Sequence, residues 1–146
     1  MATPTGLRGL KVLVVEDLFL LGETIRDHLE SCGCEVVGPA ASLQRALELA
    51  IGTSLDGAVL DINLDGELSF PVAACLEASG VPFVFLTGYD DPSIVPAEFR
   101  SLPHLTKPCD YAELTAALAN AFCKPGAKTI RPGVEAGGLT AEQRLT

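Results

Sequence analysis

Carboxyl groups, a hydroxyl and an amine follow four short apolar runs of this chain, at the point where each run ends. The residues are Glu16 and Asp17, Asp61, Thr87, and Lys107. Carboxylate oxygens are ligands that a hard cation such as Mg²⁺ prefers, and Mg²⁺ bridges readily to phosphate oxygens. A lysine amine can reach a phosphoryl group as a flexible point charge. The set therefore suits a divalent cation together with a phosphoryl group, with Asp61 as its central residue.

The four apolar runs must bring these groups together. They cover residues 12–15, 58–60, 83–86 and 104–106, and we interpret each as a strand. In an open α/β sheet, ligands bind outside the carboxyl ends of the parallel strands, near the point where the strand order reverses. We therefore expect the three carboxylates, the hydroxyl and the amine to meet at that edge of the sheet.

Helical patterns alternate with these runs from Leu10 to Phe122, which is typical of βαβ units. Ser42 and Asp110 are expected to cap two of the helices. A further helix is expected at about 69–78, with Pro71 in its first turn, where a missing N–H costs little. In the other three helices the residues expected to face the core are Leu18, Leu21, Ile25 and Leu29; Leu43, Ala46, Leu47, Ala50 and Ile51; and Tyr111, Leu114, Leu118 and Phe122.

These elements predict a doubly wound α/β fold with a five-stranded parallel sheet in the order 2-1-3-4-5 and helices on both faces. The second strand is expected to be short, at about 34–37. Three prolines interrupt residues 90–103, so we expect short turns and high mobility there. Residues 1–123 are expected to form one domain. Residues 124–146 are expected to form a flexible tail that is too short for an output domain.

The charge of the chain argues against nucleic-acid binding. The net charge is −9; residues 1–123 hold six basic and seventeen acidic residues (−11), and residues 124–146 hold four basic and two acidic residues (+2). Nucleic-acid binding draws most of its affinity from basic contacts to phosphate. No apolar run approaches the ~20 residues that span a bilayer, and no signal peptide precedes the first strand. We therefore expect a cytoplasmic protein without a membrane or nucleic-acid partner.

Five cysteines, an odd number, show neither zinc-site nor thioredoxin spacing. They are Cys32, Cys34, Cys75, Cys109 and Cys123. We interpret them as reduced thiols that serve as small apolar residues, with a redox role as the alternative.

Four motifs, in this order, resemble those of the receiver domain of two-component response regulators, over about residues 8–123. They are Val15-Glu16-Asp17, Leu60-Asp61-Ile62-Asn63, Leu86-Thr87-Gly88 and Thr106-Lys107-Pro108. The resemblance implies a three-layer sandwich of the flavodoxin-like or CheY-like type. It also implies that the protein is not an enzyme in the usual sense, and only assists its own phosphorylation and dephosphorylation.

The resemblance also implies a role for each site residue. Asp61 would accept a phosphoryl group from a phosphohistidine. Glu16, Asp17, Asp61 and the backbone carbonyl of Asn63 would hold Mg²⁺, with Glu16 acting through water. Thr87 would be the switch hydroxyl and Lys107 the phosphate-binding lysine.

A finer resemblance lies at Phe85-Leu86-Thr87-Gly88-Tyr89, which is similar to a subfamily of single-domain receivers named for a Phe-Ala-Thr-Gly-Tyr-like motif. Many receivers carry an aromatic switch residue three positions before the lysine. His104 stands there in this chain, so Tyr89 and His104 are the two candidates for that switch.

The expected function is that of a stand-alone receiver that is phosphorylated by a sensor histidine kinase or a phosphotransfer protein. It would then bind an unknown downstream protein or drain phosphate from a shared kinase, and a homodimer is left open. The alternatives are a protein-interaction module that works without phosphorylation, and a Mg²⁺-dependent phosphatase. A calcium site is disfavoured, because the EF-hand-like run 61–66 has Val72 where a bidentate Glu is required.

Overall fold

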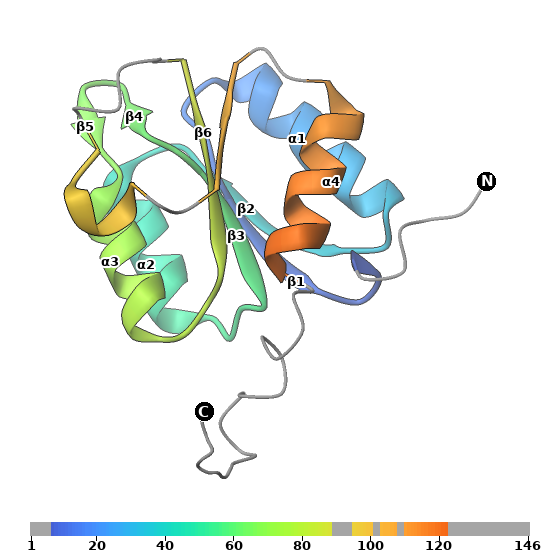
Figure 1. The fold of residues 1–146 in the computed structure, drawn as a ribbon, viewed down its shortest axis with the longest axis horizontal. Coiled ribbons are helices and arrows are strands. Elements are labelled where there is room, and N and C mark those ends of the chain that lie inside the picture. Colours follow the sequence, from blue (N-terminus) through green and yellow to red (C-terminus); the bar gives the residue numbers. More distant parts are fainter. Residues whose placement is uncertain (1–6, 89–94, 101–102, 108–109, 123–146) are drawn as a thin grey trace, which may run out of the picture.

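A five-stranded parallel sheet forms the centre of the molecule (Figure 1). The computed structural model describes residues 7–88, 95–100, 103–107 and 110–122. The sheet has the order β2-β1-β3-β6-β7, and all four neighbouring pairs are parallel. Its strands are β1 (Lys11–Val15), β2 (Glu35–Ala40), β3 (Gly57–Asp61), β6 (Phe83–Thr87) and β7 (His104–Thr106). With the strands of this sheet counted in chain order, this is 2-1-3-4-5, and the predicted order is confirmed.

Helices cover both faces of the sheet, which gives the predicted three-layer sandwich. They are α1 (Phe19–Ser31), α2 (Leu43–Gly52), α3 (Phe70–Ala78) and α4 (Tyr111–Phe122). Helices α1 and α4 lie on one face, and α2 and α3 lie on the other (Figure 1). Among the described residues, no helix has both the length and the apolar character that a membrane span requires.

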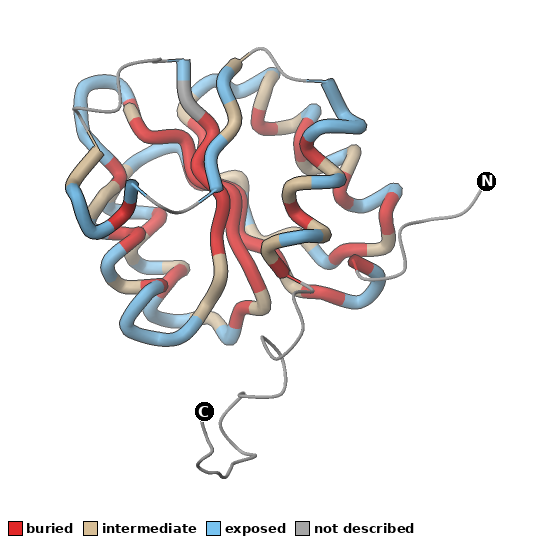
Figure 2. The backbone as a smooth tube through the Cα atoms, viewed as in Figure 1, coloured by how far each residue is buried: buried red, intermediate tan, exposed pale blue. Residues whose placement is uncertain are grey.

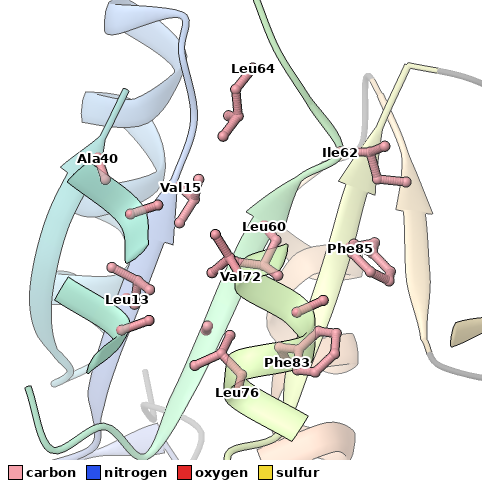
Figure 3. Packing of buried hydrophobic residues seen from close by; sticks show 14 of the residues in the cluster. Leu13, Val15, Ala40, Leu60, Ile62, Leu64, Val72, Leu76, Phe83 and Phe85 are labelled. Carbon is pink, nitrogen blue, oxygen red and sulfur yellow. The ribbon is translucent and has the colours of Figure 1, made fainter. Parts of the chain in front are cut away.

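The strands alternate their side chains between two apolar layers, because successive residues of a strand point to opposite faces. Leu13, Leu60 and Phe85 pack toward α2 and α3, on the side drawn in Figure 3. Their neighbours Val59 and Val84 pack toward α1 and α4. The strands of the sheet centre are therefore buried almost continuously (Figure 2). This explains why they appear in the sequence as unbroken apolar runs.

The predicted helix caps are present. The Ser42 hydroxyl accepts a hydrogen bond from the Arg45 amide at 3.1 Å. At the start of α4, the Asp110 carboxylate accepts from the Glu113 amide at 2.7 Å, and the Glu113 carboxylate accepts from the Asp110 amide at 3.1 Å. This reciprocal capping box fixes where α4 begins, four residues after Lys107.

Several predicted details were wrong. Leu18 and Ile51 are exposed rather than packed on the core, because Leu18 precedes the first turn of α1 and Ile51 lies near the end of α2. Tyr111 is also about half exposed. Strand β2 begins one residue later than predicted and continues to Ala40.

Of residues 90–103, the structure describes 95–100 and 103, where a single turn of 3₁₀ helix (η3, Ala97–Phe99) fits the predicted short turns.

A two-stranded hairpin after β3 was not predicted. It pairs β4 (Asn63–Leu64) with β5 (Glu67–Leu68), and Asp65 and Gly66 form its two-residue turn. Both turn residues have positive φ, 54° and 94°, which suits the aspartate–glycine turn of a tight hairpin. The Asn63 side-chain oxygen accepts from the Gly66 amide at 2.7 Å and closes the turn.

Candidate functional site

Two neighbouring strands place the acidic residues at the same edge of the sheet. Strand β1 ends at Val15, directly before Glu16 and Asp17, and β3 ends at Asp61. The two strands are parallel, with Val15 opposite Leu60, so Glu16 and Asp61 emerge side by side. The backbone register of the two apolar runs therefore accounts for the meeting of these carboxyl groups.

The three acidic side chains form a compact cluster. Glu16, Asp17 and Asp61 each offer one oxygen, and these oxygens all lie within 4.8 Å of one another. Glu16 is 1% exposed and Asp61 is 5% exposed, whereas Asp17 is half-buried. Two of the three carboxyl groups are thus almost completely withdrawn from water, and a buried charge requires a partner.

Lys107 supplies the positive charge nearest to this cluster among the described residues. Its Nζ lies 2.9 Å from Glu16 Oε1 and donates a hydrogen bond to Asp61 Oδ2 at 3.2 Å. Lys107 follows β7, and β6 separates β7 from β3 in the sheet. The lysine side chain therefore reaches past the end of one strand to contact both buried acids.

The electrostatics of Asp61 follow from this arrangement. Burial raises the pKa of Asp61 and the charge of Glu16 raises it further, whereas Lys107 lowers it, and the result is about 7. Burial lowers the pKa of Lys107, but its contacts with Glu16 and Asp61 outweigh burial, and this pKa is raised. At neutral pH the lysine is therefore charged, and Asp61 is poised between its two protonation states.

These residues fit a hard divalent cation. Clustered carboxylates repel one another, and a cation or a proton must relieve that repulsion. Burial and then the charge of Glu16 raise the pKa of Asp61 to about 7, and a bound cation would offset both effects. Oxygen ligands from Glu16, Asp17 and Asp61 match the preference of Mg²⁺, which also keeps several waters.

The structure describes the other predicted site residues in less detail. Asn63 follows Ile62 at the start of the hairpin, where its side chain closes the turn. Thr87 ends β6, and only its backbone is described. His104 is exposed on β7, opposite Phe85. Tyr89, the other switch candidate, lies outside the described residues.

Two side-chain contacts were missed by the sequence analysis. The ion pair between Glu16 and Lys107 was not expected, because Glu16 had been considered only as a metal ligand. His28 was also overlooked, although its ring contacts Tyr111 and Thr115 on α4. A half-buried histidine carries no periodic signal, so only the structure could reveal its partners.

Comparisons with known proteins agree with this geometry. No protein-family model matches the chain. The sensory transduction protein LytT of Bacillus cereus is 32% identical over 112 residues, which are 75% of this chain and 46% of LytT. LytT of Bacillus subtilis is 31% identical over 104 residues, which are 69% of this chain and 43% of that protein. The chain thus matches just under half the length of these curated relatives.

Solved structures match over most of their own length. The signal receiver domain of a modulated diguanylate cyclase from Desulfovibrio desulfuricans G20 is 31% identical, with a TM-score of 0.70 over 80% of this chain and 95% of that one. SdrG from Sphingomonas melonis Fr1 is 39% identical, with a TM-score of 0.67 over 76% and 94%. The receiver domain of a sensor histidine kinase from Pseudomonas aeruginosa PAO1 shares the fold at 23% identity, with a TM-score of 0.69 over 79% and 98%, and it coordinates magnesium in its active-site cleft. The chain belongs to the receiver domains of response regulators.

Proposed function

We propose that this receiver accepts a phosphoryl group on Asp61 from a histidine kinase or a phosphotransfer protein. The observation that carries the proposal is the contact of Lys107 with both Glu16 and Asp61 at the edge of the sheet. This arrangement sets the buried carboxylate of Asp61 beside two further acidic side chains and a lysine. A carboxylate nucleophile, oxygen ligands for a cation and a positive charge are the parts that phosphoryl transfer to a carboxylate uses.

In the proposed step, an Asp61 carboxylate oxygen attacks the phosphorus of a phosphohistidine. The new O–P bond forms as the P–N bond breaks, and the donor imidazole keeps the electron pair and takes up a proton. Lys107 binds an oxygen of the transferred group, and the Thr87 hydroxyl then donates a hydrogen bond to a phosphoryl oxygen as the switch. Catalysis in such transfers is mainly positioning and charge stabilisation.

Glu16, Asp17, Asp61 and the backbone carbonyl of Asn63 would hold Mg²⁺. The ion would neutralise negative charge on the pocket and on the phosphoryl oxygens. The support is the compact acidic cluster of this chain, together with the magnesium site of the Pseudomonas receiver domain.

The phosphorylated receiver would signal through contact with another protein, or would act as a phosphate sink for a shared kinase. A phosphoryl group adds about two negative charges and strong acceptor oxygens, which is enough to reorganise a neighbouring loop. We place the chain in the subfamily with the Phe-Ala-Thr-Gly-Tyr-like motif, with Tyr89 or His104 as the switch, and in the cytoplasm. In this proposal the receiver unit is 1–123.

The test is to weigh the intact protein after incubation with phosphoramidate and Mg²⁺. We expect a single phosphoryl adduct on the wild type and none on Asp61→Asn. Asp65→Asn is the matched control, because Asp65 is an exposed aspartate in the hairpin turn and Asn also tolerates its positive φ. An adduct that persists in Asp61→Asn would contradict the proposal. No adduct on the wild type would favour an interaction module that works without phosphorylation.

A further inference from the structure

The imidazole of His28 joins helix α1 to the start of helix α4. Its Nε2 lies 2.6 Å from the Thr115 hydroxyl oxygen. Its ring stacks on the ring of Tyr111, with centroids 4.5 Å apart and planes inclined by 11°. Tyr111 and Thr115 are four residues apart and so lie on the same face of α4. A single side chain of α1 therefore contacts the first two turns of α4 at once, and we call these three residues the His28 clamp.

Each of the two helices joined by the clamp begins, in the sequence, shortly after a residue of the site. Helix α1 begins two residues after Asp17, and α4 begins four residues after Lys107. Four residues of chain span at most about 14 Å, so the position of Tyr111 limits where Lys107 can lie. Helices α1 and α4 run side by side on one face of the sheet (Figure 1), where both contribute to one apolar layer.

The strand that precedes Lys107 in the chain, β7, holds its backbone only weakly. Strand β7 has three residues, and among the described strands it pairs only with β6. His104 and Thr106 of this strand are exposed, and Leu105 is half-buried. The amine of Lys107 is held by Glu16 and Asp61, so the start of α4 is the second element, beside the short strand β7, that can constrain its backbone.

The partly buried environment of His28 favours its contacts with Tyr111 and Thr115. Burial lowers the pKa of His28, which favours a neutral ring at neutral pH. A neutral imidazole can stack on a phenol ring without having to keep a charge solvated, and one ring nitrogen remains to bond the Thr115 hydroxyl.

We propose that His28 is a positioning residue that acts through Tyr111 and Thr115 to hold Lys107 at the Asp61 carboxylate during phosphoryl transfer. This inference rests on the proposed function. Its physical basis is that small displacements of a group that contacts the reacting atoms can lower a rate strongly, even when the displaced contact lies far from the chemistry.

The test uses the full chain and compares the rate of Asp61 phosphorylation by phosphoramidate at saturating Mg²⁺ with the dissociation constant for Mg²⁺. In His28→Ala we expect the rate to fall about 5- to 10-fold, with the Mg²⁺ constant unchanged within about twofold. Glu16, Asp17 and Asp61 stand at the ends of β1 and β3, whereas the clamp joins α1 to α4. A general loss of structure would weaken both quantities. Tyr111→Phe should keep the wild-type rate because it keeps the ring. Glu30→Ala, an exposed change on the same helix, is the matched control.

A double-mutant cycle decides whether His28 acts through Lys107. In a Lys107→Ala background, His28→Ala should change the rate by less than about twofold, because the residue it positions is gone. An undiminished loss in that background would overturn the inference, and so would a wild-type rate in His28→Ala alone. Thr115→Val keeps the shape of Thr115 and removes its hydroxyl. It should lower the rate about threefold, and it provides the same test if His28→Ala does not fold.

The outcomes for the two proposals are separable. If the wild type forms no adduct, the proposed function fails. If the wild type is phosphorylated on Asp61 and the clamp variants react at its rate, only the role of the His28 clamp fails.

Discussion

Asp61 experiences opposing influences whose balance sets its chemistry. Burial and the neighbouring Glu16 favour the protonated acid, whereas the amine of Lys107 favours the carboxylate. The outcome, a pKa of about 7, means that the folded protein resists the ionisation that a nucleophile needs. Positive charge bound at the cluster would shift this balance toward the carboxylate. The chemistry and the stability of the site are therefore coupled.

The stability of the metal-free protein should depend on pH through Asp61. Its pKa is about 7 in the folded protein and about 3.9 in an unfolded chain. Between these values the folded protein holds a proton that the unfolded chain has lost. The stabilisation is thus fully present below pH ~4 and is lost as pH rises through ~7. Asp61→Asn has no carboxyl group to ionise at this position and so avoids the loss of stability. At pH 7 to 8 in EDTA it should raise the free energy of unfolding by about 1–3 kcal/mol.

Urea unfolding from pH 5 to pH 8 measures this effect. The wild type should lose stability relative to Asp61→Asn as the pH rises. Parallel pH profiles for the two proteins, or a less stable Asn variant at pH 8, would show that the carboxyl group of Asp61 is not destabilised by the fold.

Magnesium should stabilise the folded protein through the same residues. At a free concentration ten times its dissociation constant, a ligand that binds only the folded state adds about 1.4 kcal/mol to the free energy of unfolding. We expect this gain in the wild type and its loss in Asp17→Asn at the same Mg²⁺ concentration. Asp27→Asn, an exposed change on α1, is the control. Equal gains in all three proteins in thermal unfolding experiments would place the cation elsewhere.

At the scale of elements, the start of β3 depends on a glycine. A Cβ built on Gly57 would lie 2.6 Å from the Phe122 ring, which is fully buried at the end of α4. Glycine therefore allows the last turn of α4 to pack directly against the strand that ends in Asp61. Gly57→Ala should lower the free energy of unfolding by about 1–3 kcal/mol because the ring has to move.

Chemical denaturation of Gly57→Ala and Gly52→Ala tests this packing argument. A Cβ on Gly52 meets no atom within 4 Å, so that change should be neutral or slightly stabilising. If Gly57→Ala were as stable as the wild type, the close contact between β3 and α4 would not be rigid.

The elements also show what the sequence could and could not predict. Apolar runs such as 12–15 predicted the strands because both faces of the sheet are covered, and Ser42 and Asp110 marked two helix starts through their capping chemistry. The hairpin was missed because strands of two residues carry no periodic signal, although Asp65-Gly66 is a recognisable turn pair. Leu18 was misplaced because it continues the helical spacing of α1 while lying just before its first residue.

At the scale of the whole molecule, the sheet gathers residues that are far apart in the chain. The acidic pair, Asp61 and Lys107 come from three strand ends, and the sequence predicted their convergence because parallel strands share one carboxyl edge. Side-chain contacts across elements were beyond such reasoning. The pairing of Lys107 with Glu16 depends on how far one flexible side chain reaches, and the contacts of His28 depend on how α1 and α4 cross.

The measurement that tests the central claim most directly is chemical trapping of the phosphorylated residue. Borohydride reduces an acyl phosphate on an aspartate to homoserine, which peptide mapping can locate. After incubation with phosphoramidate and Mg²⁺, we predict homoserine at position 61 and at no other aspartate, and none when EDTA replaces Mg²⁺. Trapping at another acidic residue, or at position 61 without a divalent cation, would contradict the account.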